Sequence, residues 1–278
     1  MTLQEGLMFG KQQLEEVQIE DASLDAWYLL EHVCKIDRVS YYMQPEKPMS
    51  SREIKEYKTL IIERRKHIPL QYLTKDQMFM GLSFFVNQEV LIPRQDTESL
   101  VEAALKVLKP GMDVLDMCTG SGCILISLMK FCQGLKGTGV DVSKGALEVA
   151  KKNAKIHKVA ADFIESDLFL QIDGLYDMII SNPPYIKRSV LDTLMPEVKD
   201  HEPMVALDGD EDGLSFYKRM VKESESYLKP GGYLYFEIGH DQGREVSCLM
   251  ERQGYTNVKV EKDLAGLDRI VYGRRRIK

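Results

Sequence analysis

Short apolar segments alternate with segments of helical length from residue 112 onward, and this alternation limits the possible folds more than any other feature. Such alternation is typical of a parallel sheet with helices on both faces. Ala265-Gly266 marks a turn between two further segments that can pair as antiparallel strands. We therefore predict an α/β fold. The predicted strands are 113–116, 137–142, 161–165, 178–181, 233–238, 257–261 and 269–272, and the predicted helices include 123–132 and 144–157.

The first 68 residues instead repeat apolar side chains at helical spacing. Asp21 is a predicted N-cap, and Ser50 with Glu53 forms a predicted capping box. Pro69 disfavours a helical conformation at Ile68, so the helix should end there. A small helical domain is therefore expected at the start of the chain.

A β-hairpin is predicted between these two regions. Apolar residues, most of them aromatic or β-branched, occupy 84–86 and 90–92, and three polar residues separate them. A helix is predicted to follow at 97–108. The expected parts of the chain are a helical domain at 1–75, a β-hairpin linker at 76–95 and an α/β domain at 96–278.

Composition narrows the classes of protein that fit the sequence. The chain has 278 residues and a formal net charge of −6, which argues against a broad duplex-binding face. No apolar run approaches the roughly 18–20 residues that cross a bilayer, and no signal peptide is evident, so we expect a cytoplasmic protein. The cysteines and histidines lack the spacing of metal ligands, so no metal is expected. The basic run at 274–278 has two interpretations, a solvated chain end or an RNA contact.

A turn containing glycine follows the first strand of the predicted sheet. Residues 114–122 read Val-Leu-Asp-Met-Cys-Thr-Gly-Ser-Gly. Glycine lets the backbone bend tightly and approach a ligand. In open α/β sheets, ligands bind at the carboxyl ends of the strands, where this turn falls. The turn alone leaves two interpretations, a cofactor site (a dinucleotide included) or a tight strand–helix connection.

Two carboxylates follow at the ends of the next two strands. Asp141 comes about 20 residues after the glycines, which is the spacing of an acid that binds ribose hydroxyls. Asp167 ends the third strand and is suited to accept from an adenine amino group. Either acid alone is equally well explained as a helix cap or turn residue. Together they favour a cofactor with an adenosine part.

The sequence Asn182-Pro183-Pro184-Tyr185 follows the fourth strand. Proline has a fixed φ and cannot donate to a ladder, so the strand must end in a stiff turn. The side-chain oxygen of Asn182 and the carbonyl of Pro183 can together accept two hydrogen bonds from one NH₂ group. Tyr185 can stack its ring on a flat substrate. A rigid proline turn without function is the structural alternative.

The nitrogen of an amide or an exocyclic amine is a poor nucleophile, because its lone pair is delocalised. Holding both hydrogens out of plane favours a more pyramidal nitrogen whose lone pair points at an electrophilic methyl group. In-line transfer then depends chiefly on positioning and electrostatics. The tetrapeptide therefore predicts N-methylation of a planar nitrogen, with no evident general base.

These motifs resemble those of a known enzyme family. Asn-Pro-Pro-Tyr after the fourth strand is similar to the signature of methyltransferases acting on adenine N6 or glutamine N5. The other motifs resemble the bacterial release factor glutamine methyltransferases (the PrmC, or HemK, family) over essentially the whole chain. They are Pro-Leu-Gln-Tyr at 69–72, Leu-Ile-Pro-Arg-Gln-Asp-Thr-Glu at 91–98, Glu-Pro at 202–203, Ala-Leu-Asp-Gly at 206–209 and Asp-Gly-Leu at 212–214.

The resemblance implies a Rossmann-like class I methyltransferase domain with a seven-stranded, mostly parallel sheet that uses S-adenosyl-L-methionine. The implied substrate is the glutamine of the Gly-Gly-Gln motif in peptide chain release factors, which the helical domain helps to hold. We expect a monomer without membrane contact or sequence-specific nucleic-acid binding. The implied cofactor-binding residues are Cys118, Thr119, Gly120, Ser121, Gly122, Asp141, Asp167, Leu168 and Asn182. The implied catalytic and substrate-binding residues are Asn182, Pro183, Pro184 and Tyr185, with Arg94 and Glu98 near the mouth of the site.

Two positions depart from the family pattern. Cys118 and Lys75 stand where glycine is usual, so a slightly different backbone is expected at both. The tetrapeptide does not distinguish a release factor from a ribosomal-protein glutamine or from adenine N6, although the acidic charge and the missing target-recognition domain argue against DNA. A scaffold without turnover is a third alternative, which the intact motif disfavours. Residues 187–212 are long for a loop and predict a lid over the acceptor site.

Overall fold

The computed structural model describes residues 1–277, and the chain divides into two compact units. The first, here called the helical unit, comprises Met1–Lys75 and Met195–His201. The second, here called the sheet unit, comprises Asp76–Leu194 and the described residues from Glu202 onward. Lys278, the last residue of the predicted basic run, lies outside the described residues.

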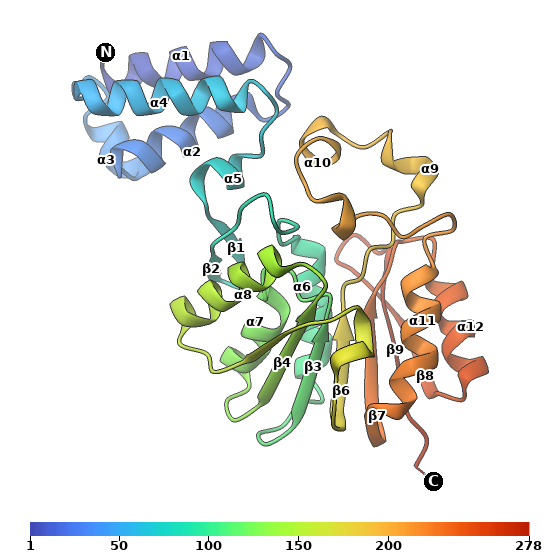
Figure 1. Cartoon of the computed structure of the whole chain (residues 1–278). Helices are drawn as coiled ribbons and strands as arrows, with labels where there is room; N and C mark the ends of the chain where they lie inside the picture. The colour runs from blue at the N-terminus through green and yellow to red at the C-terminus, as the bar shows by residue number, and fades with distance from the viewer. Residues whose placement is uncertain (278) are drawn as a thin grey trace. The chain divides into compact units, whose positions relative to one another are not determined.

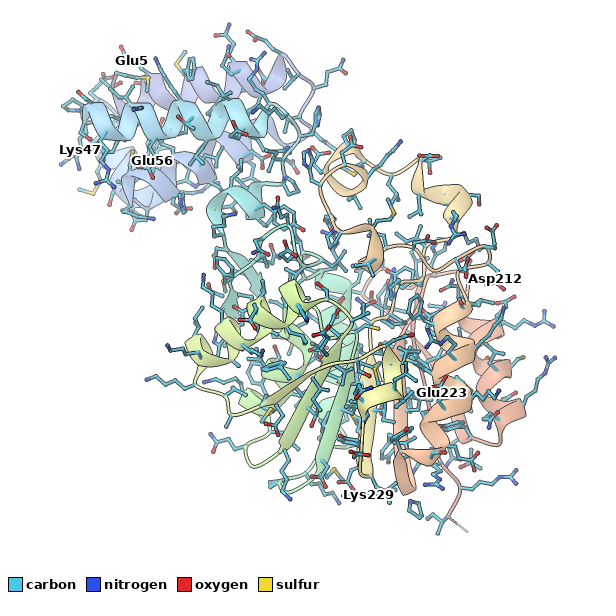
Figure 2. All side chains as sticks on the ribbon, viewed as in Figure 1. Glu5, Lys47, Glu56, Asp212, Glu223 and Lys229 are labelled. Carbon is cyan, nitrogen blue, oxygen red and sulfur yellow. The ribbon has the colours of Figure 1, made fainter. Side chains whose placement is uncertain are left out.

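The helical unit is built from amphipathic helices around a core that includes Leu14, Leu30 and Tyr57. The predicted capping box of Ser50 and Glu53 is confirmed, and a second box begins the first helix, where Glu5 is labelled in Figure 2. The helices are α1 (Leu3–Glu15), α2 (Ala22–Cys34), α3 (Arg38–Met43), α4 (Ser51–Arg64), α5 (Leu70–Thr74) and α10 (Pro196–Lys199).

Two expected helix ends differ in detail. Asp21 is the N-cap residue of α2, but its side chain makes no capping hydrogen bond. Helix α4 ends at Arg64, four residues before the predicted end at Ile68. Residues 65–67 form a turn instead of continuing the helix toward Pro69.

Arg64 joins α10 to the other helices of this unit. Its guanidinium is almost fully buried and pairs with Asp25 at 2.6 Å and with Glu197 of α10 at 3.0 Å. The ring of His67 is 3.2 Å from the same Glu197 carboxylate. A buried charge requires such partners, since an unpaired one would be strongly destabilising. These contacts hold a segment distant in sequence against α2 and α4.

The sheet unit contains one seven-stranded sheet in the order β5-β4-β3-β6-β7-β9-β8 (Figure 1). Strands β3 to β7 pair in parallel, whereas β9 pairs antiparallel with both β7 and β8. The predicted α/β fold class is confirmed. The strands are β3 (Asp113–Met117), β4 (Lys136–Asp141), β5 (Asp162–Glu165), β6 (Tyr176–Ser181), β7 (Leu228–Glu237), β8 (Thr256–Lys262) and β9 (Asp268–Arg274).

Helices cover both faces of this sheet, so the central strands are apolar on both sides. Adjacent residues Val114 and Leu115 of β3 belong to different core clusters. Leu100 and Ile124 pack on the first face, and Tyr217 packs on the second. The helices of the sheet unit, including those of the segment 187–212, are α6 (Gln95–Leu105), α7 (Cys123–Phe131), α8 (Lys144–His157), α9 (Arg188–Leu191), α11 (Ser215–Glu223) and α12 (Gly243–Gln253), with short 3₁₀ turns η1 (Leu168–Gln171), η2 (Met204–Ala206) and η3 (Ser224–Ser226).

Charged side chains meet at the amino ends of the parallel strands. Lys229, labelled in Figure 2, lies 2.7 Å from both Asp113 and Asp177. The Lys229 ammonium lowers the pKa of Asp113 through the hydrogen bond between them. These ion pairs link the amino ends of β3, β6 and β7.

The predicted positions of the hairpin strands are wrong. The hairpin consists of β1 (Gln77–Phe79) and β2 (Leu82–Phe84), which turn at Met80-Gly81. Both turn residues have positive φ, as a two-residue hairpin turn of type I′ requires. No strand follows over 85–94. At Phe85, the Asn153 side chain bonds both the backbone N–H and the carbonyl. A side chain thus supplies the partners that a neighbouring strand would have given.

Residues 187–212 form an ordered excursion rather than a structureless loop. Its neck is closed by a bridge between Ile186 and Asp208, with Gly209 N donating to the Ile186 carbonyl at 2.8 Å. Helices α9 and α10 and the turn η2 lie within it, and α10 belongs to the helical unit. Whether the excursion orders further on substrate binding stays a prediction.

Candidate active site

The turn after β3 brings backbone N–H groups to the carboxyl end of the sheet. Cys118, Gly120 and Gly122 all have positive φ, at 60°, 54° and 79°. At Gly122 a Cβ atom would meet Ile126 at 3.0 Å and Ala150 at 3.2 Å, so a larger residue would push α7 from α8. The glycines therefore let the chain turn sharply while α7 stays close to its neighbour.

Asp141 holds this turn from the end of β4. Its Oδ2 accepts a hydrogen bond from Gly120 N at 2.9 Å, and its Oδ1 accepts one from Ser143 N at 2.9 Å. Burial raises the pKa of Asp141, although both N–H groups favour the charged form. The carboxylate is thus fixed beside the turn, at the carboxyl ends of two neighbouring strands.

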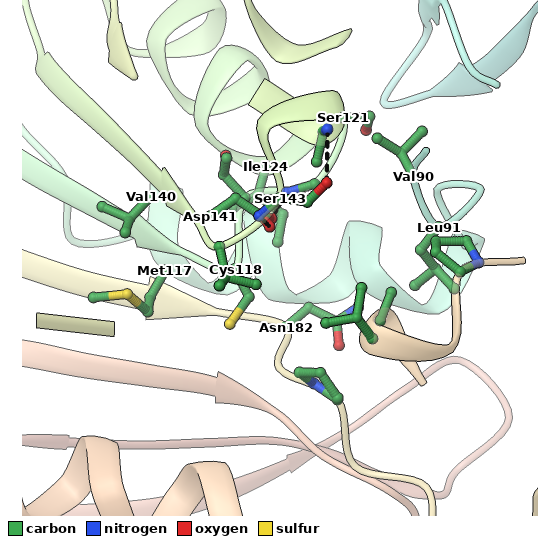
Figure 3. A pocket seen from close by; sticks show the side chains of 18 of the residues that line it. Val90, Leu91, Met117, Cys118, Ser121, Ile124, Val140, Asp141, Ser143 and Asn182 are labelled. Atoms are coloured by element: carbon green, nitrogen blue, oxygen red, sulfur yellow. Dashed lines mark hydrogen bonds between the residues drawn. The ribbon is translucent and has the colours of Figure 1, made fainter. Parts of the chain in front are cut away.

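A cavity of about 280 Å³ lies against the turn and against the tetrapeptide after β6. Figure 3 shows Cys118, Asp141 and Asn182 bordering it together. Of the sequence-predicted site residues, the cavity is lined by Arg94, Cys118, Thr119, Gly120, Ser121, Asp141, Asp167, Leu168, Asn182 and Pro184. Gly122, Pro183, Tyr185 and Glu98 are not among its lining residues. The two predicted parts of the site therefore share one cavity.

Asp167 and Leu168 lie after β5. Asp167 pairs with Arg219 of α11 at 2.9 Å, and both line the cavity. Leu168 begins the turn η1 with a φ of 49° and is almost completely buried. An apolar wall beside an acid suits a flat base that carries an amino group.

Asn182 is positioned from behind by α6. Its Nδ2 donates to the Thr97 hydroxyl at 3.2 Å, and Thr97 is buried against the same cavity. An amide has a donor end and an acceptor end, so this bond directs the Oδ1 atom away from Thr97. The acceptor atom of Asn182 is thus free to face a ligand.

Tyr185 is not among the lining residues of the cavity, and its expected stacking on a flat substrate stays a prediction. Its hydroxyl donates to Glu237 Oε1 at 3.3 Å, and its ring packs against the core cluster of β7. Glu237 ends β7 and is 1% exposed. Burial raises the pKa of Glu237 to about 7. Tyr185 therefore links the tetrapeptide to the end of β7.

Arg94 and Glu98 have different environments. Arg94 lines the cavity, is 39% exposed and pairs at 2.6 Å with Glu202, whose side chain is 1% exposed. Burial raises the pKa of Glu202 although Arg94 favours its charged form. Glu98 instead accepts from Met80 N at 2.6 Å in the hairpin turn. Glu98 is not among the lining residues of the cavity, so its expected place near the mouth of the site stays a prediction.

Comparisons with known proteins give the family. The PrmC N-terminal domain family matches residues 5–74, and the methyltransferase small domain family matches residues 95–197. A release factor glutamine methyltransferase of Geobacter sulfurreducens is 39% identical over 98% of this chain and 96% of its own length. One of Clostridium acetobutylicum is 37% identical over 98% of both. The chain belongs to the release factor glutamine methyltransferase family.

The fold of this release factor glutamine methyltransferase family member is shared more widely. A crystal structure of a methyltransferase from Pyrococcus furiosus superposes with a TM-score of 0.55 at 15% identity, over 79% of this chain and 98% of that one. At that identity the likeness concerns the fold alone. Among the described residues, none of the helices is both long and apolar enough to cross a membrane.

Both departures from the family pattern keep the conformation that glycine favours. Cys118 and Lys75 have φ of 60° in each case. A backbone different from that of relatives with glycine stays a prediction at both positions. The chain places L-residues in the left-handed region there, at a cost of about 1–2 kcal/mol each.

Sequence reasoning missed two buried acids, Asp116 and Glu237, whose hydrogen-bond partners belong to the predicted site motifs. Asp116, at the end of β3, is fully buried and accepts from the Thr119 hydroxyl at 2.6 Å; burial raises the pKa of Asp116 to about 7. Glu237 likewise ends β7, and its buried carboxyl accepts from the Tyr185 hydroxyl. The rule that identified Asp141, an acid at a strand end, would have found both.

Proposed function

We propose that this chain transfers a methyl group from S-adenosyl-L-methionine to the side-chain amide nitrogen of the Gly-Gly-Gln glutamine in peptide chain release factors. The observation that carries the proposal is the shared cavity: Asn182 and Pro184 border the same space as the glycine turn and Asp141. An activated methyl and an amide nitrogen can meet there without a proton being moved first.

The residues around the turn fit the proposed cofactor. The Asp141 carboxylate can accept from two ribose hydroxyls, and Val142 with Leu168 gives an apolar lining for adenine. Asp167 can accept from the adenine amino group. When bound, the cofactor would supply a methyl group on a positively charged sulfur, open to attack by nitrogen. The chain itself contributes position and exclusion of water.

The tetrapeptide would hold the acceptor amide. Asn182 Oδ1 and the Pro183 carbonyl would each accept one N–H of the glutamine NH₂, which turns the nitrogen lone pair toward the methyl group. The prolines fix the backbone of both acceptors. Preorganised acceptors of this kind stabilise the positive charge that develops on nitrogen during transfer.

The identity of the substrate is proposed from the relatives, since release factor glutamine methyltransferases cover nearly the whole chain. We propose a substrate-binding role for residues 1–75, a linker role for 76–95 and the methyltransferase role for 96–278, acting as a monomer in the cytoplasm. A ribosomal-protein glutamine and adenine N6 offer a similar NH₂ group and remain the alternative acceptors.

The test is methyl transfer from isotopically labelled cofactor to a purified release factor. We expect one methyl group on the Gly-Gly-Gln glutamine, located by mass spectrometry, and none on a release factor carrying Gly-Gly-Ala. An unmodified glutamine under conditions where the cofactor binds would overturn the proposal. Label on a ribosomal protein or on duplex DNA, but not on the release factor, would support the alternatives.

A further inference from the structure

The charged side chains in the wall of the cavity do not balance one another. Arg94 pairs with Glu202 at 2.6 Å. Arg219 pairs with Asp167 at 2.9 Å. Each arginine of the lining is therefore neutralised by an acid beside it. The charged residues that line the cavity are Glu89, Arg94, Asp141, Asp167 and Arg219.

Glu89 and Asp141 are the acids of this lining that form no ion pair within residues 1–277. The Asp141 carboxylate accepts from the backbone N–H groups of Gly120 and Ser143, and these neutral donors leave its charge uncompensated. A cleft lined by charge of one sign attracts ligands of the opposite charge, because its low-dielectric walls focus the electric field. The cavity should therefore favour a cationic ligand.

The backbone and a neighbouring helix place Glu89 at the end of the cavity proposed for the cofactor. Asn87 Oδ1 accepts from Glu89 N at 3.0 Å, and the Asn87 carbonyl accepts from Val90 N at 3.2 Å. Val90 is 1% exposed and anchors this turn (Figure 3). The Glu89 carboxyl lies against Gly145 in the first turn of α8, where a Cβ atom would be 2.7 Å from Glu89 Cδ. Glycine at 145 thus leaves room for the carboxyl just after Asp141.

We propose that Glu89 is a specificity-determining residue that favours the cationic cofactor over the neutral product left after methyl transfer. The inference rests on the proposed function, because it concerns the cofactor of that reaction. Transfer breaks an S–CH₃ bond and forms an N–CH₃ bond; the sulfur keeps the electron pair and becomes neutral, and the nitrogen loses a proton to water. S-adenosyl-L-methionine therefore carries a positive charge on sulfur that S-adenosyl-L-homocysteine lacks. Glu89 attracts the first more strongly and so favours the exchange of product for new cofactor.

The experiment compares the Kd values for these two nucleosides, measured by calorimetry, in the full-length wild type and in Glu89→Gln. Glutamine keeps the shape of glutamate and removes its charge. We expect the ratio of the Kd for S-adenosyl-L-homocysteine to the Kd for S-adenosyl-L-methionine to fall about threefold, as for loss of one partly solvated charge near a cation. Because salt screens this attraction, the two proteins should show the same ratio at about 1 M salt.

A charge reversal extends the test. Glu89→Lys places a cation where the wild type has an anion, so the ratio should fall further than in Glu89→Gln, by roughly tenfold from the wild type. A residue that only supports the turn at 87–90 would not produce an effect graded by charge. Equal ratios in the two variants would therefore contradict the inference.

Glu148→Gln is the matched control. Glu148 is an exposed acid on α8, like Glu89 in charge, but it pairs with Lys151 at 2.9 Å and is not among the lining residues of the cavity. We expect the wild-type ratio in this variant. A fall equal to that in Glu89→Gln would mean that the net charge of the protein, and not Glu89, sets the preference.

The binding measurements separate the inference from the proposed function. A wild type that binds neither nucleoside would overturn the proposed function. A wild type that binds S-adenosyl-L-methionine, with the same ratio of Kd values in Glu89→Gln and Glu89→Lys as in the wild type, would overturn the role of Glu89 alone.

Discussion

The two halves of the cavity are built in different ways. The half proposed for the cofactor comes from consecutive strand ends, namely the turn after β3 and the acids after β4 and β5. The half proposed for the acceptor gathers Arg94, Thr97, Asn182 and the residues after Glu202 from separate segments. Backbone conformation shapes the first half, whereas side-chain contacts across the fold shape the second. Changes in the first should therefore alter cofactor affinity, and changes in the second should alter the rate.

The largest expected effect lies in the acceptor half. Asn182→Ala removes the proposed acceptor of the substrate N–H, so methyl transfer should fall by roughly 100–1000-fold. The Kd for the cofactor, measured by calorimetry, should stay near that of the wild type. A parallel loss of cofactor affinity would remove the division between the halves.

A smaller effect, on the affinity for the cofactor and not on the rate, is expected in the cofactor half. Asp141→Ala deletes a carboxylate that also holds Gly120 N and Ser143 N. The Kd for the cofactor should rise roughly 10–100-fold, as expected for a lost hydrogen bond to a charged group. At saturating cofactor, kcat should recover to within about threefold of wild type, as steady-state kinetics would reveal. A kcat that stayed low would place Asp141 in the chemistry itself.

Two buried acids, Asp116 and Glu237, should make the stability of the fold depend on pH. Burial raises the pKa of both Asp116 and Glu237 to about 7, above the ordinary values of 3.8 and 4.5. The folded chain therefore keeps protons that the unfolded chain has already released, so the free energy of unfolding should fall as pH rises from about 4 to 7. Urea titrations at several pH values would measure this slope.

Neutral isosteres should divide that slope between the halves. Asp116→Asn and Glu237→Gln should each flatten part of it. An unchanged slope in both variants would contradict the assignment of the slope to these two acids.

The smallest expected effect tests the two left-handed residues. Lys75 is exposed, with a φ of 60°, so Lys75→Gly should raise the free energy of unfolding by about 0.5–1 kcal/mol. Cys118→Gly relieves the same conformation but removes a side chain that packs against the core, so its gain should be smaller. Thermal melts of both variants would rank them. A larger gain at Cys118 would mean that its thiol does not stabilise the cavity wall.

The sequence predicted the cofactor half better than the acceptor half, for a physical reason. Strand ends and positive-φ turns are local, so β4 and the turn at Gly120 could be placed from neighbouring residues alone. Phe85 was predicted in a strand, whereas its backbone bonds the side chain of Asn153, far along the chain. The contact of Tyr185 with Glu237 was not predicted, because Glu237 lies on another strand. Contacts between residues far apart in the sequence leave no regular spacing from which they could be predicted.

The excursion after the tetrapeptide has a consequence for how the chain can be cut. Because Met195–His201 packs with the first 75 residues, the polypeptide passes between the two units three times, after residues 75, 194 and 201. A protease that cleaved only after residue 75 would leave both units joined, with Glu197 still paired to Arg64. A truncated chain that starts at residue 76 would lack Arg64 and would leave Glu197 without that partner. Removing the first 75 residues would therefore also disturb the segment Met195–His201.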